Sequence, residues 1–329
     1  MEQDYRRAIR YALEEKGLWA AGLIAALAFS EAWWLVFDWG PESLGERWER
    51  SVGAVLGDAA ALIAFVAAAL AAFLAIKAVG YLGEMVLVRQ VADGERGNVP
   101  RFDGAFSASR HGYLPFAVTL LPWDALRIAL IYLPSLMIAL WDRWDPDLDH
   151  IFLYLLALLL WFCLLVAASV FAGITATLAA RCSLLWERGI PGAWREGWRL
   201  FRADSSRCVV AWLQVLAVDI AFVAIAWPLS ALLPWAAGQL VDPIGFAPLR
   251  WLIRAAVWLI LAGGLVIIQT GTQCFRSSLW TITYLELREG DARDEATVSP
   301  RAADGEEGEA FRPPLTDLPG PPPGLLPPP

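Results

Sequence analysis

The stretch "LPWDALRIALIYLP", Leu121–Pro134, places an aspartate and an arginine three residues apart inside a run of apolar side chains. Similar runs recur along the 329-residue chain, in which 58% of the residues are hydrophobic and the mean hydropathy is +0.50. Several runs reach about twenty residues, the length at which a helix crosses the hydrocarbon core of a bilayer. The sequence therefore predicts an all-α, polytopic membrane protein that carries Asp124 and Arg127 at membrane depth.

Six segments are apolar and long enough to span, at about 18–39, 52–78, 114–141, 151–180, 209–236 and 252–273. Arginine and lysine are concentrated at the N-terminus, in the connection between the second and third segments, and in that between the fourth and fifth. Positive residues mark the cytoplasmic side of bacterial-type membrane proteins. We therefore expect a multi-pass protein of the cytoplasmic membrane with both termini in the cytoplasm.

Amphipathic stretches precede the odd-numbered segments. They are "YRRAIRYALEEKG" (5–17), "PRFDGAFSASRHGYL" (100–114) and "PGAWREGWRLFRADSSRC" (191–208). In the last, Trp194 and Trp198 share one helical face, and the arginines of the next face are Arg195, Arg199 and Arg202. This pattern favours a helix in the membrane interface whose arginines point toward lipid phosphates. The alternative is a helix packed across the inner mouth of the bundle.

An internal repeat explains the charged residues in the apolar runs. Segments that begin at Glu31, Asp124 and Asp219 each reach a proline nine or ten residues later. The simplest account is three parallel repeats at about 1–96, 97–188 and 189–288, each an amphipathic helix followed by a helical hairpin. We expect the prolines to bend or end the odd-numbered helices.

The carboxylates at membrane depth have two interpretations. An unpaired carboxylate there costs at least a few kcal/mol, and Arg127, three residues after Asp124, is a counter-ion on the same helix face. One interpretation is a proton or cation pathway that uses Glu31, Asp124 and Asp219. The other is that these side chains bond neighbouring helices and hold the repeats together.

Residues 289–329 differ in composition from the rest of the chain. From Glu286 onward ten Asp and Glu face four Arg, so this end carries −6 of the net charge of −8, and the last residues are rich in proline. We expect a disordered cytoplasmic tail, acidic and then proline-rich. A protein partner for the proline-rich part is the less favoured alternative to a solvated tail.

Motifs of catalysis are missing from the sequence. It has no HExxH, G-x-S-x-G or P-loop pattern, no CxxC among its four cysteines, and only two histidines. We expect no enzyme activity, no cofactor, no metal site and no nucleic-acid partner. Membrane lipids are the expected partners.

The segment "GIPGAWREGWRLFRADSSRCVVAWLQVL" (189–216) resembles bacterial and archaeal six-helix proteins related to the membrane domain of glycerophosphoryl diester phosphodiesterase. "NVPRFDGAFSASRHGYLPFAVTLL" (98–121) is similar to the earlier connection of those proteins, and the resemblance covers about residues 5–288. It implies a six-helix integral membrane fold without catalysis, since the chain has no counterpart of the phosphodiesterase barrel. No site residue is carried over from the family.

Two function hypotheses follow. The first is a non-enzymatic membrane protein that organises lipid or partner proteins through its interfacial helices and tail. The second is a small transporter or channel that uses Glu31, Asp124 and Asp219, with Arg127 as internal counter-ion.

Overall fold

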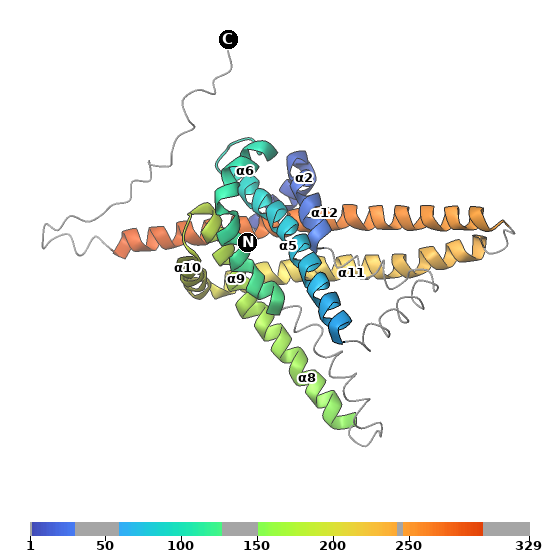
Figure 1. Cartoon of the computed structure of the whole chain (residues 1–329). Coiled ribbons are helices and arrows are strands. Elements are labelled where there is room, and N and C mark those ends of the chain that lie inside the picture. The colour runs from blue at the N-terminus through green and yellow to red at the C-terminus, as the bar shows by residue number, and fades with distance from the viewer. Residues whose placement is uncertain (1, 30–58, 127–150, 242–245, 299–329) are drawn as a thin grey trace, which may run out of the picture. The chain divides into compact units, whose positions relative to one another are not determined.

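The computed structural model describes residues 2–29, 59–126, 151–241 and 246–298 (Figure 1). Of these residues 94% are helical, and none of them lies in a strand. Four helices are long and apolar enough to cross a membrane: Leu70–Glu95, Leu156–Leu185, Ser205–Leu233 and Pro248–Gly290. The all-helical class is therefore confirmed, together with the membrane-protein character that four such helices indicate.

The described helices follow one another closely along the chain. They are α1 (Glu2–Glu14), α2 (Lys16–Phe29), α5 (Ala59–Glu95), α6 (Phe102–Ser109), the short η1 (Arg110–Gly112), a helix over 113–126, α8 (Ile151–Ala168), the π-helical turn η3 (Ser169–Gly173), α9 (Ile174–Leu185), α10 (Ile190–Ala203), α11 (Ser205–Val241) and α12 (Ala247–Val298). All three predicted amphipathic stretches form helices, as α1, α6 and α10.

Two of the six predicted spans extend beyond the described residues. The first segment, 18–39, begins in a shorter apolar helix, Lys16–Ala26, and 30–39 lies outside the description. The third segment, 114–141, begins in the helix over 113–126, and 127–141 also lies outside. Six spans and their threefold repeat therefore stay predictions.

The main buried core lies where three of the long helices meet the amphipathic ones. Its members come from the C-terminal parts of α5, α9 and α12 and from α1, α2, α6 and α10, and they include Met85, Leu178, Leu200 and Leu279. Elsewhere the long helices expose large apolar side chains such as Leu159, Phe162 and Ile260. Apolar exposure along helices of spanning length is what lipid contact requires.

Glycine permits two backbone-to-backbone contacts in this core. A Cβ added at Gly83 of α5 would lie 2.5 Å from the backbone nitrogen of Ala25 in α2. A Cβ at Gly197 of α10 would lie 2.8 Å from the backbone nitrogen of Ala179 in α9. Small residues let helices approach this closely and pack tightly. The amphipathic helix α10 is thus held against α9 by a contact that excludes any larger side chain.

Helix α11 corrects the expectation for its proline. Pro228 was expected to bend or end the helix, but α11 continues through Pro228 and Pro234 to Val241. Phe222 and Ala226 of this part pack against Leu261 of α12, and the two helices run side by side (Figure 1). A neighbouring helix and local adjustment make proline tolerable within a membrane helix. The corresponding Pro41 and Pro134 lie outside the described residues.

Helix α12 also extends further than the composition suggests. It continues to Val298, ten residues beyond Arg288, into the segment 289–329 for which disorder was predicted. The chain divides into two units, Met1–Glu289 and Gly290–Pro329. The sites described below belong to the first unit.

Candidate functional site

Asp124 lies in a buried ion pair with a second helix. The residue is 7% exposed, and its Oδ2 is 3.0 Å from Nζ of Lys77 in α5. The hydroxyl of Tyr81, one turn further along α5, donates to the same oxygen at 2.8 Å. Arg127, the predicted counter-ion, lies outside the described residues. The charge of Asp124 is therefore balanced from α5, which the spacing of Asp124 and Arg127 did not indicate.

Asp219 of α11 also pairs with a cation on another helix. Nη2 of Arg276 in α12 donates to its Oδ2 at 2.5 Å. The Asp219 side chain is 38% exposed, so this pair is less enclosed than the pair of Asp124. Sequence reasoning found no cation on the same helix, because the partner lies 57 residues away along the chain. Glu31, the third predicted carboxylate, lies outside the described residues.

A third group, which the sequence analysis missed, joins α5, α9 and α12. Arg181 of α9 donates through Nη2 to Oε1 of Glu84 at 3.1 Å. Gln273 of α12 donates through Nε2 to the other oxygen, Oε2, at 2.9 Å. All three side chains are buried, with Arg181 only 2% exposed. Their signal in the sequence was the occurrence of three long polar residues in segments that are otherwise apolar.

These three groups are continuous along two helices. On α5, Lys77, Tyr81 and Glu84 follow one another at helical spacing and so lie on one face. On α12, Gln273 and Arg276 are three residues apart and are neighbours on the surface of that helix. We refer to the whole set as the polar layer: Lys77, Tyr81, Glu84, Asp124, Arg181, Asp219, Gln273 and Arg276. It pairs three carboxylates with three cations, so its formal charge is zero, and it connects five helices.

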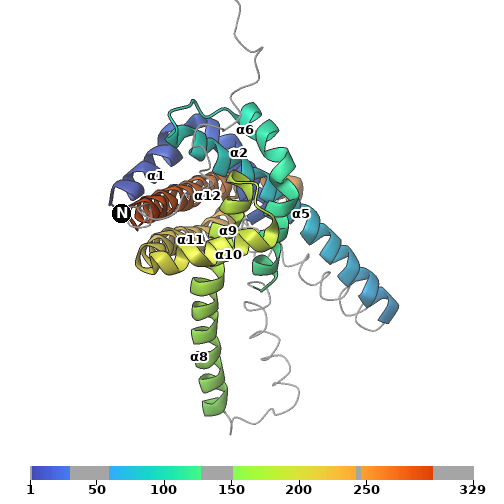
Figure 2. The ribbon, with the colours of Figure 1, turned by 90° about the vertical axis from the view of Figure 1, so that its left-hand side faces the viewer.

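A second ionic cluster joins α1 to α5, α11 and α12. Arg7 donates to Glu95 and to Asp4, both at 2.8 Å, and also pairs with Glu286. Arg207 pairs with Asp4 at 2.6 Å and with Glu286. In Figure 2, α1 lies beside α12, as these contacts require. The cluster fixes the amphipathic N-terminal helix to the ends of three long helices.

Tyr11 lies at the edge of this cluster. Burial, reinforced by the negative charge of Glu95 and a hydrogen bond with it, raises the pKa of Tyr11 to about 12. The ring lies against α5, because a Cβ at Gly94 would be 2.6 Å from the Tyr11 oxygen. The phenol therefore stays neutral at pH values at which an exposed tyrosine ionises.

Glu196 anchors α10 from its buried side. The residue is 5% exposed and accepts hydrogen bonds from Arg199 at 2.9 Å, from Arg288 at 3.3 Å and from Arg188 at 3.4 Å. The Arg288 guanidinium lies 3.7 Å from the centroid of the Trp186 ring. The buried face of α10 is thus tied to α12 as well as to α9.

The exposed face of α10 carries four of the predicted lipid-contact residues. Arg195, Trp198, Arg199 and Arg202 are exposed and spaced as neighbours on one helix face; we call them the α10 stripe. The Arg202 guanidinium lies 5.1 Å from the Trp198 ring centroid. Trp194 is not part of this surface, because it is partly buried against the core. Phe201, expected to share a face with the two tryptophans, is itself buried.

The described residues contain no group of three or more His, Cys, Asp and Glu that could hold a metal ion. Comparisons with protein-family models, curated proteins and solved structures found no match. The class that the fold and these sites define is therefore an all-helical membrane protein with internal ion pairs. The resemblance to the six-helix proteins related to the phosphodiesterase membrane domain stays a prediction.

Proposed function

We propose that the chain is a non-enzymatic, multi-pass protein of the cytoplasmic membrane that organises lipids or partner proteins through its amphipathic helices. In this proposal both termini are cytoplasmic, and α1, α6 and α10 lie at the inner surface of the bilayer. The bundle fixes these helices in position, and their exposed faces carry the activity.

The α10 stripe is the observation that carries the proposal. Three arginines and a tryptophan lie on one exposed face, while Glu196 and Gly197 hold the opposite face to the bundle. A guanidinium matches the geometry of a phosphate oxygen pair, and an indole ring prefers the headgroup level. Because the buried face is fixed, the arginines are presented without the cost of folding a helix at the membrane surface.

The polar layer supports a structural role for the carboxylates at membrane depth. Asp124, Asp219 and Glu84 each bond a cation on another helix. The cavity beside α1 and the small cavity beside Arg207 include none of these three carboxylates in their linings. Ion pairs between helices specify which helices meet, since breaking one leaves an uncompensated buried charge.

The test is the selection of anionic lipid by the purified protein. Membranes that contain phosphatidylglycerol and phosphatidylcholine are solubilised, and the lipid retained by the protein is measured by mass spectrometry. We expect enrichment of phosphatidylglycerol by the wild type and a loss in the pair Arg195→Gln/Arg202→Gln. The loss should approach roughly fivefold per arginine, because a basic residue near an anionic surface contributes about 1 kcal/mol.

The matched control removes two charges from the connection between α5 and α6, as Arg96→Gln/Arg101→Gln. This pair should retain the wild-type enrichment. Equal enrichment in the wild type and the α10 pair, or an equal loss in the control pair, would refute the proposed role of α10. Arg199 is left unchanged because it also bonds Glu196.

The second candidate is a small transporter that uses Glu31, Asp124 and Asp219 for proton or cation coupling. The exposed fraction of Asp219 favours it, because 38% of this side chain is accessible although it is paired with Arg276. Liposomes with an internal pH-sensitive dye test this candidate under an imposed proton gradient. Flux in the wild type that disappears in folded Asp124→Asn and Asp219→Asn variants would support it, and absence of flux in the wild type would exclude proton transport.

A further inference from the structure

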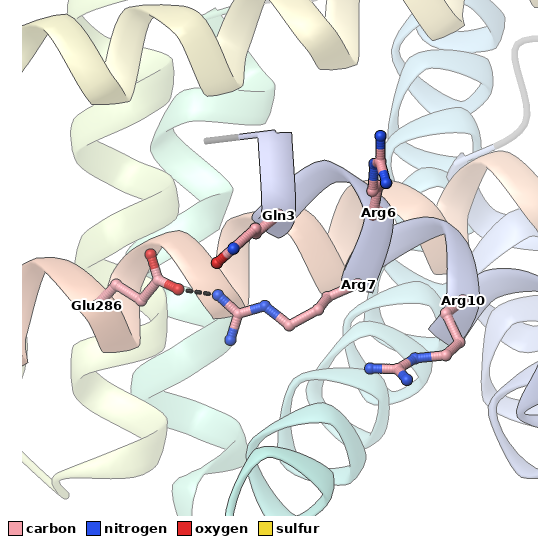
Figure 3. A pocket seen from close by; sticks show the side chains of 5 residues that line it. All are labelled: Gln3, Arg6, Arg7, Arg10 and Glu286. Carbon is pink, nitrogen blue, oxygen red and sulfur yellow. Dashed lines mark hydrogen bonds and ion pairs between the residues drawn. The ribbon is translucent and has the colours of Figure 1, made fainter.

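A cavity of about 650 Å³ lies between α1 and α12 and is lined by Gln3, Arg6, Arg7, Arg10 and Glu286. Figure 3 shows Gln3 and Arg7 extending from α1 toward Glu286. The volume is within the range of pockets that bind small molecules, roughly 300–1,000 Å³. The cavity is distinct from the polar layer and from the α10 stripe, since it shares no residue with either.

The lining carries an excess of positive charge. Three arginines face a single carboxylate, and that carboxylate, Glu286, is already paired with both Arg7 and Arg207. Arg7 also bonds Asp4 and Glu95, so its guanidinium is fixed in the wall of the cavity. The charge that faces a ligand therefore comes from Arg6 and Arg10, which are exposed and one helical turn apart.

We infer that this cavity binds the phosphate group of an anionic ligand. Arg6 and Arg10 supply charge-assisted hydrogen bonds, the Gln3 side-chain amide supplies a neutral donor, and Arg7 with Glu286 forms the fixed wall. Arginine pairs favour phosphate because the planar guanidinium donates two parallel N–H bonds. A fixed wall lowers the ordering cost of binding, because four helices are already joined by the cluster beneath it.

Two sources could deliver this phosphate chemistry: the headgroup of an anionic phospholipid and a soluble phosphate ester. Leu13 continues the exposed face of α1 beyond Arg10 and is 70% exposed. An exposed apolar residue next to arginines suits the boundary between headgroups and acyl chains. The inference itself concerns the phosphate site, which both sources share.

The experiment uses the full-length protein in nanodiscs and follows the midpoint of thermal unfolding, which rises when a ligand binds the folded state. In one arm, nanodiscs of phosphatidylcholine receive increasing glycerol 3-phosphate. In the other, the fraction of phosphatidylglycerol in the nanodiscs is raised. The variants are Arg6→Gln/Arg10→Gln on α1 and, as a charge-matched pair, Arg195→Gln/Arg202→Gln on α10.

We expect the wild-type midpoint to rise in at least one arm, and the α1 pair to require about tenfold more of the same anion for an equal rise. A response in the lipid arm alone identifies a headgroup site, and a response to glycerol 3-phosphate identifies a site for soluble esters. An α1 pair that responds like the wild type, or a wild type that responds in neither arm, would overturn the inference.

The two pairs of variants separate this inference from the proposed function. The α10 pair should keep the part of the response that depends on Arg6 and Arg10. A normal response in the α10 pair with a lost response in the α1 pair would count against the role of the α10 stripe and leave the α1 site standing. The unfolding curves without added anion report whether each variant is folded.

Discussion

Arg181 of α9 and Glu84 of α5 form an ion pair of 3.1 Å in which both side chains are buried. Gln273 of α12 donates to the second carboxylate oxygen. One side chain from each of three long helices thus meets at a single carboxylate. Since the charges are removed from water, the pair specifies the arrangement of these helices more than it adds to their stability.

Removing one partner of this pair should be costly. Arg181→Met leaves the Glu84 carboxylate buried with only Gln273, and we expect a loss of about 3–5 kcal/mol in the free energy of unfolding. The double variant Glu84→Met/Arg181→Met should recover much of that loss because no charge stays buried. Denaturant titration in bicelles gives both values. A single substitution that costs no more than an exposed one, such as Arg101→Gln, would show that the pair is not enclosed.

The contact of α10 with α9 should depend on the absence of a side chain at Gly197. Gly197→Ala forces the two backbones apart, since its Cβ would lie 2.8 Å from Thr175 O and Ala179 N, and should cost about 1–3 kcal/mol. Gly192→Ala in the same helix is the control, because its Cβ would meet only the Arg188 Cβ at an ordinary 3.9 Å. Thermal unfolding compares the two variants, and equal midpoints would contradict the described packing.

The polar layer should tolerate exchange better than deletion at Lys77 and Asp124. Asp124→Leu leaves Lys77 buried beside Tyr81 without its carboxylate, whereas Lys77→Asp/Asp124→Lys restores one charge of each sign. We expect the exchanged protein to unfold at a higher temperature than either single exchange variant. Lack of coupling between the two positions in this double-mutant cycle would mean that they do not interact.

The described architecture could be predicted from the sequence only in part. Apolar runs and amphipathic stretches predicted an all-helical membrane protein and the helices α1, α6 and α10 correctly. The partners of Asp124 and Asp219 could not be predicted, because Lys77 and Arg276 lie on other helices. Periodicity within one helix identifies a buried face, but it does not specify the helix that covers it.

Glu84 and Arg181 illustrate the same limit. Each looks like an isolated polar residue in an apolar segment, and 97 residues separate them. Pro228 misled the prediction for the opposite reason, because the local rule for proline was overridden by the packing of α11 against α12. Local signals were reliable for the type of each element and weak for contacts between elements.

Alkaline pH should loosen the attachment of α1 through Tyr11. Its pKa in the folded protein is raised to about 12, first by burial and then by Glu95, whereas an unfolded tyrosine ionises near pH 10. The folded state therefore binds the phenol proton more tightly, and stability falls as pH rises from about 10 to 12. Tyr11→Phe should remove this part of the pH dependence. Unchanged profiles of unfolding midpoint against pH would contradict the described environment of Tyr11.

The most direct test of the central claim is the depth of the α10 stripe in the membrane. A spin label is attached to Trp198→Cys in a background in which Cys163, Cys182, Cys208 and Cys274 are replaced by alanine, and its depth is measured in vesicles that contain phosphatidylglycerol. The account predicts a label at the level of the lipid phosphates that moves toward water when Arg195→Gln/Arg202→Gln is added. A label that meets water-soluble reagents as freely as an unattached one, with no effect of the arginine substitutions, would contradict it.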